Sequence, residues 1–256
     1  MRSLSVLQLA PFDTTRVLVT SPFLRPSVLG AIRLVIACYT LVTLVFSVAR
    51  GIKDAALFFP LFTHLTYSGL CVYFFAAGLQ TAVYARHREK GYPLQGSAKP
   101  WRFLYLALLS TITVFPFLVT TMFWALVYNS STFASGSSGL SAISEGLLSA
   151  VFALFEILLT DTPASAWLLL PFGILLLLLY IGLGFIVFAT QGSYTVAQNT
   201  HPLQLALNIL TIVLIECAVF AIVHWIVALR QRVVARFVRA EVKATPWETE
   251  GLIPLR

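Results

Sequence analysis

Six long apolar stretches dominate the pattern of hydrophobic and polar positions along the chain. They cover residues 29–49, 57–85, 103–128, 145–160, 166–189 and 203–229. A helix needs about 20 apolar residues to cross the hydrocarbon core of a bilayer, which is about 30 Å thick. Five of the six stretches reach that length, and the fourth is shorter. The pattern therefore predicts an all-α polytopic membrane protein, with a bundle of six transmembrane helices over residues 29–229.

The composition agrees with a membrane protein. Hydrophobic residues make up 59% of the chain and charged residues only 11%, whereas a soluble domain carries about 25% charged residues. The net charge of +7 would suit nucleic acid, but the basic residues lie at the edges of the apolar stretches. We therefore expect them to meet lipid headgroups, and we expect no nucleic-acid partner. The three cysteines show no C-x-x-C spacing, so no metal or cofactor is expected.

The basic residues also predict an orientation. With six spans, 15 of the 17 Lys and Arg residues fall on one side of the membrane, and only Arg50 and Lys53 fall on the other. Arg33 is counted on the basic side, as a residue at the border of the first stretch. The positive-inside rule then predicts that both termini are cytosolic. This bias does not distinguish the endoplasmic reticulum from the plasma membrane.

The two ends of the chain are expected to lie outside the bundle. Residues 1–28 contain three prolines and are predicted to be an irregular cytosolic lead. Residues 230–256 form a basic cytosolic tail, whose first part alternates valines with arginines. That part is either an interfacial helix on anionic lipid or a continuation of the sixth helix, and the final residues are expected to be disordered. On the opposite side, Asn129 begins an Asn-Ser-Ser glycosylation pattern.

Ionisable residues inside the apolar stretches are candidates for a site, because charge is costly in hydrocarbon. The expected depths place Thr63, His64 and Glu145 together in an outer layer. They place Glu156 and His224 near each other in an inner layer, as a second candidate pair.

A structural role is the alternative for each of these residues. Polar side chains between membrane helices contribute about 0.6 kcal/mol each on average. This role is expected for Glu156, Glu216 and His224. Glu145 could simply cap the start of its helix, where a negative charge is favourable.

Two segments carry a resemblance to a known family. FTHLTYSGLCVYFFAAGLQT (62–81) and SEGLLSAVFALFEILLTDTP (144–163) resemble the androgen-induced (FAR-17a-like) multi-pass membrane proteins, particularly those of fungal type. Some animal members hydrolyse branched fatty-acid esters with an intramembrane Thr nucleophile and a His. The rolling-stone family has a similar layout, and that resemblance would imply a membrane protein without catalytic activity.

The first resemblance implies a catalytic role for one threonine. The family's Thr matches Thr63, and its later Asn-His-x-x-His motif falls on SEGLL (144–148), where Glu145 and Leu148 replace the two histidines. A hydroxyl nucleophile needs a neighbouring base, and Leu148 cannot act as one. Either the activity is lost, or His64 or Glu145 serves instead.

Three functions therefore stay open from the sequence. The first is a hydrolase of lipid esters at Thr63, with membrane lipid and a lipid ester as its partners. The second is a non-catalytic membrane scaffold or lipid-binding protein. The third is a transporter, which would need inverted halves and helices broken at mid-depth; the chain shows no internal similarity of that kind.

Overall fold

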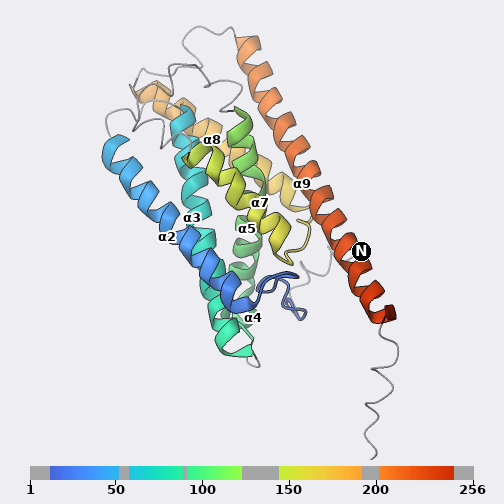
Figure 1. Cartoon of the computed structure of the whole chain (residues 1–256). Helices are drawn as coiled ribbons and strands as arrows, with labels where there is room; N and C mark the ends of the chain where they lie inside the picture. Colours follow the sequence, from blue (N-terminus) through green and yellow to red (C-terminus); the bar gives the residue numbers. More distant parts are fainter. Residues whose placement is uncertain (1–11, 52–57, 89–90, 123–143, 192–201, 245–256) are drawn as a thin grey trace, which may run out of the picture.

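The computed structural model describes residues 12–51, 58–88, 91–122, 144–191 and 202–244, and every regular element in these ranges is helical. Each of the six apolar stretches contains a helical element among the described residues, so the predicted all-α class is confirmed for them (Figure 1). In chain order the helices are α2 (Pro26–Gly51), α3 (Phe58–Arg86), α4 (Pro93–Gly96), α5 (Lys99–Met122), the π-helical turn η4 (Ser144–Leu148), α7 (Ser149–Leu159), α8 (Leu169–Gln191) and α9 (Pro202–Ala244).

Four of these helices are long and apolar enough to cross a membrane. The qualifying segments are Pro26–Ser47, Phe62–Arg86, Lys99–Met122 and Leu203–Arg236, and two shorter apolar helical segments cover Gly146–Leu159 and Leu169–Leu183. Large apolar side chains are exposed along the outer faces of α2 and α9, among them Val35, Val42, Val45, Leu203, Leu207, Leu214, Trp225 and Leu229. Apolar surface of this extent is typical of contact with lipid rather than water.

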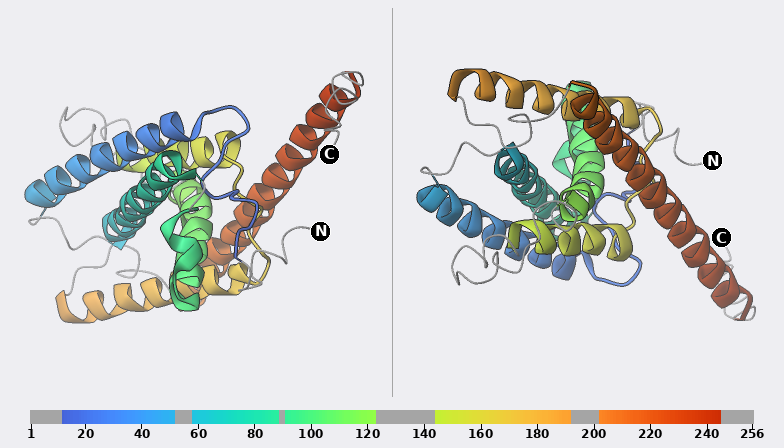
Figure 2. Two further views of the ribbon diagram at one scale, coloured as in Figure 1. Left: turned by 90° about the horizontal axis from the view of Figure 1, so that it is seen from below. Right: turned by 90° about the horizontal axis from the view of Figure 1, so that it is seen from above.

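Helix α9 continues beyond the predicted end of the sixth stretch. It runs without interruption for 43 residues, from Pro202 to Ala244, which corresponds to about 65 Å of helix. Figures 1 and 2 show its C-terminal half extending away from the other helices. Of the two alternatives for the basic tail, the structure has the continuation of the helix as far as Ala244.

Helices α2 and α3 form a closely packed antiparallel pair, which small residues make possible. A Cβ atom on Gly30 would lie 3.2 Å from the backbone nitrogen of Ala82. A Cβ atom on Gly78 would lie 2.8 Å from a methyl carbon of Leu34. Close approach through small residues is a common way to pack membrane helices, because lipid supplies no hydrophobic drive between them.

Polar contacts identify which helix ends lie together. Asp13, in the N-terminal lead, accepts a hydrogen bond from the Tyr92 hydroxyl at 2.5 Å, and its carbonyl accepts one from Gln95 at 2.8 Å. Burial, and then the neighbouring Asp13 carboxylate, raise the pKa of Tyr92. The backbone of Asp161, just after α7, donates to the carbonyl of Thr20 in the lead at 3.0 Å. We call this end of the bundle, defined by Asp13, Tyr92 and Asp161, the lead end.

The opposite end is marked by a contact between α5 and η4. The Thr120 hydroxyl, near the end of α5, donates to the carbonyl of Gly146 at 2.5 Å. Helices α2 and α5 therefore begin at the lead end, and α3 and α7 finish there. This alternation in direction is the one that the sequence predicted, although it does not by itself say on which side of a membrane each end lies.

Candidate functional site

A buried ion pair joins two helices near the lead end. The guanidinium of Arg33 on α2 contacts the carboxylate of Glu156 on α7, and both side chains are fully buried. The contact is two-pronged: Arg33 Nε donates to Oε2 at 3.2 Å, and Nη2 donates to Oε1. This fork geometry is the strongest that arginine makes with a carboxylate.

Further hydrogen bonds complete the environment of both charges. Arg33 Nη1 donates to the Thr81 hydroxyl at 2.6 Å and to the Leu18 carbonyl at 3.1 Å. The Tyr73 hydroxyl donates to Glu156 Oε1 at 2.7 Å. We call the residues Arg33, Tyr73, Thr81 and Glu156 the Arg33 cluster. It connects α2, α3, α7 and the N-terminal lead in one buried network.

The bonds of this cluster connect helices to one another. Each nitrogen of Arg33 and both oxygens of Glu156 are used in contacts within the protein. Glu156 Oε1 accepts two hydrogen bonds and Oε2 accepts one, and the Tyr73 hydroxyl acts as a donor in this arrangement. Buried charges are tolerated only when their partners satisfy them this fully.

The environment of Arg33 differs from the one the sequence predicted. The sequence places Arg33 at the border of the first stretch, where basic residues are expected to meet lipid headgroups, but in the structure it lies inside the bundle with no exposed surface. The reason is the carboxylate of Glu156, which offsets the cost of removing the guanidinium from water. The other 14 basic residues on the predicted cytosolic side keep the charge bias strong.

The predicted inner pair of Glu156 and His224 is wrong. The Nδ1 atom of His224 lies 3.0 Å from the carbonyl oxygen of Ser165, in the segment between α7 and α8. Its ring packs against Trp167, with ring centroids 4.7 Å apart. Arg33 approaches Glu156 from α2 and occupies the position that the sequence analysis gave to the histidine.

A neighbouring arginine holds α9 to the end of α7. Arg230 donates through Nη1 to the Ile157 carbonyl at 2.5 Å, and through Nη2 to the Thr162 carbonyl at 2.6 Å. The Ile157 carbonyl lies in the last turn of α7, where carbonyls lack intrahelical donors, so Arg230 satisfies a group that would otherwise be unpaired. The contact fixes the depth of α9 relative to the Arg33 cluster.

The predicted outer layer is described only in part. Thr63 lies in the second turn of α3 with 7% of its surface exposed, and the adjacent His64 is half-buried. Glu145 belongs to η4, which is in contact with α3. The structure thus brings the two elements together, but the side chain of Glu145 lies outside the described residues. Asn129 lies outside them as well.

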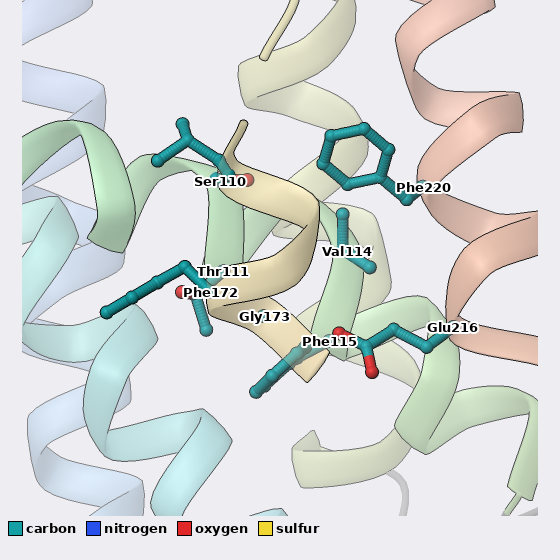
Figure 3. Close-up of a pocket in the computed structure, with 9 residues that line it drawn as sticks. Ser110, Thr111, Val114, Phe115, Phe172, Gly173, Glu216 and Phe220 are labelled. Atoms are coloured by element: carbon teal, nitrogen blue, oxygen red, sulfur yellow. The ribbon is translucent and has the colours of Figure 1, made fainter. Parts of the chain in front are cut away.

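A second buried acid has a different environment. Glu216 on α9 exposes 1% of its surface, and its Oε2 atom has no hydrogen-bond partner. Its carboxyl extends toward Gly173 on α8 and borders a small cavity between α5, α8 and α9, which Ser110 and Thr111 also line (Figure 3). The contact between helices that the sequence predicted for Glu216 is therefore made without a hydrogen bond to any residue the structure describes.

Sequence reasoning missed Arg33, Tyr73 and Thr81 as members of a site. A signal for Arg33 was present, because it is the only basic residue inside the stretch 29–49, and an ionisable residue there should have a partner. Tyr73 and Thr81 gave no comparable signal, since hydroxyl groups are common in membrane helices.

Comparisons of the chain with protein-family models, with curated proteins and with solved structures found no match. The resemblance to the androgen-induced family therefore remains a hypothesis from two short segments.

Proposed function

We propose that the chain is an integral membrane protein with six spans and two cytosolic termini, and that it acts without catalysis, as a scaffold or a lipid-binding protein. The observation that carries this proposal is the Arg33 cluster. Its ionisable groups connect helices and satisfy one another, which is how a structural network uses charge. His224 and Arg230 are likewise bonded to backbone carbonyls of neighbouring segments.

The test compares stability with turnover in the purified protein. We expect Glu156→Gln to lower the thermal stability in detergent while causing no change in any ester hydrolysis, because the carboxylate serves packing alone. Arg236→Gln is the matched control, since Arg236 is exposed near the end of α9. A Glu156→Gln protein that keeps its stability but loses an enzymatic activity would contradict the proposal.

The six spans are supported by the alternation of helix directions and by the basic residues of the chain. The segments Gly146–Leu159 and Leu169–Leu183 are shorter than the four candidate spans, yet their helices lie within the same bundle (Figure 1). A chain of six spans would also explain why the lead and the end of α7 meet at one end of the bundle. Membrane lipid is then the expected partner of the exposed apolar faces.

A lipid-ester hydrolase with Thr63 as its nucleophile is the second candidate. It is favoured by the burial of Thr63 on α3 beside η4, the turn that carries Glu145. We would expect a fluorophosphonate probe to label the protein, and Thr63→Ala to abolish the labelling. Thr66→Ala is the control, because Thr66 is buried on the same helix. An unlabelled protein without ester turnover would eliminate this candidate.

A further inference from the structure

Glu216 is a buried acid that the functions proposed above leave unused. It lies 14 residues after Pro202, where α9 begins, and 14 residues before Arg230, which is bonded to the end of α7. At 1.5 Å per residue each distance is about 21 Å along the helix. Glu216 is thus at the middle of the apolar part of α9, at the depth where a bilayer is driest.

The carboxyl is accommodated by a missing side chain on the facing helix. A Cβ atom at position 173 would lie 2.7 Å from Glu216 Oε1, so the carboxyl could keep its present position only beside a glycine. The adjoining cavity has a volume of about 10 Å³, which is close to the smallest space that holds one water molecule. While α8 and α9 are packed together, the acid therefore faces a space of about the size of one water molecule.

No charge compensates an ionised Glu216 among the residues that the structure describes. On α5 the cavity is lined by Ser110 and Thr111, of which Thr111 donates to the Ala107 carbonyl at 2.7 Å. On α8 the lining residues are apolar, and on α9 the nearest titratable groups are Cys217 and His224, the latter bonded to Ser165. A lone carboxylate in this environment would be costly, so Glu216 is a neutral acid while α8 and α9 are packed together.

We propose that Glu216 is a proton-binding site at the middle of the membrane, which releases its proton to water when α8 moves away from α9. In the release step the O–H bond of the carboxylic acid breaks, and the proton passes to a water molecule in the cavity, which becomes hydronium. The carboxylate left behind is hydrated while the helices are apart, and it must regain a proton before they close. This site does not depend on whether Thr63 is catalytic.

Dicyclohexylcarbodiimide tests the proposal, because this apolar reagent reacts with protonated carboxyl groups inside membranes. The full chain in detergent micelles would be treated at a series of pH values from about 5.5 to about 8.5, a range over which buried carboxyl groups can titrate. Mass spectrometry of peptides would then locate the adduct. The reagent is much larger than the cavity, so it reaches Glu216 only while α8 and α9 are apart. We expect Glu216 to be labelled in that state at low pH, where more of the acid keeps its proton, and the labelling to fall at least about tenfold toward high pH.

Glu156 is the matched control within the same molecule. It is as buried as Glu216, but it is paired with Arg33, so it should not react. Equal labelling of both residues would overturn the proposal, because location in the membrane alone would then explain the reaction. Labelling of Glu216 that stays constant with pH would also overturn it, since the acid would then never ionise.

A second measurement does not depend on access of the reagent. Glu216→Gln preserves the shape of the neutral acid, so we expect its melting temperature to equal that of the wild type at low pH. As the pH rises, the unfolded wild-type chain releases the proton that the folded chain retains, so the wild type should lose stability relative to the variant. If the two melting temperatures stay equal at every pH and Glu216 is never labelled, Glu216 is no proton site.

Discussion

Removing one partner of the Arg33–Glu156 pair should destabilise the protein far more than removing both. Arg33→Met leaves a fully buried carboxylate without its counter-charge, and Glu156→Met leaves a buried guanidinium with only the Thr81 hydroxyl and the Leu18 carbonyl. Stranding one charge of a buried pair costs about 3–5 kcal/mol. The double variant removes both charges and replaces them with apolar side chains.

The structure indicates what the double variant should still lose. Thr81 keeps a partner, because its hydroxyl also donates to the Ala77 carbonyl at 2.7 Å. Tyr73 loses its carboxylate acceptor, since its hydroxyl donates to Glu156, and an unsatisfied buried hydroxyl costs about 1–3 kcal/mol. We therefore expect the double variant to be destabilised by about 1–3 kcal/mol, less than either single variant. Adding Tyr73→Phe should recover much of this loss.

The assay is unfolding of the purified protein in mixed micelles with an increasing fraction of sodium dodecyl sulfate. The four proteins of the cycle give the coupling free energy between Arg33 and Glu156, which we expect to exceed about 3 kcal/mol. Arg236→Met is the control for loss of an arginine at an exposed position. If the free-energy changes of the two single variants simply added in the double variant, Arg33 and Glu156 would not be energetically coupled, and the structural role of the pair would be refuted.

Three further predictions test the topology and the packing. A glycosylation site created by Gly136→Asn should be modified in eukaryotic cells, whereas one created by Trp247→Asn in the tail should not, because the proposed orientation exposes only the former to the lumen. A glycosidase-sensitive shift on gels detects modification of either site, and modification of the tail site alone would show the opposite orientation. Gly78→Ala should destabilise the protein by about 1–3 kcal/mol through overpacking. Gly182→Ala is the control and should be neutral or stabilising, because a Cβ atom at that position has no other atom within 4 Å. Equal thermal stabilities of the two variants would refute the close α2–α3 contact. Tyr92→Phe should lower the free energy of unfolding by about 1–2 kcal/mol below pH 10. This difference from the wild type should shrink above pH 10, because the pKa of Tyr92 is raised in the folded protein, so the unfolded wild-type chain ionises first and the wild type loses stability. A difference that grows with pH in unfolding titrations would contradict this.

The positions of the helices could be predicted from the sequence because the apolar stretches determine them locally. The end of α9 was harder, since residues 230–244 have the alternation of an interfacial helix and also the propensity to extend one. The ends of helices are harder to predict than their positions. By composition a basic residue such as Arg230 indicates the end of a membrane span, but in the structure α9 continues past it and its side chain bonds to the end of α7. Local pattern indicates where a helix can begin, and tertiary contacts decide what its polar residues do.

The pairing within the site depends on depth, and depth was within reach of the sequence. Arg33 lies seven residues after the start of α2, and Glu156 lies three before the end of α7, so both are about 5–10 Å from the lead end. Depth in the bundle therefore favours Glu156 as the partner of Arg33 over Glu216, which is at mid-depth. What depth cannot supply is rotation about each helix axis, and rotation determines that Tyr73 meets Glu156 while Glu216 meets a glycine. A buried acid that is paired, such as Glu156, and one that is not, such as Glu216, look alike in the sequence. Only the packing of the helices around each acid distinguishes the structural ion pair from the proposed proton site.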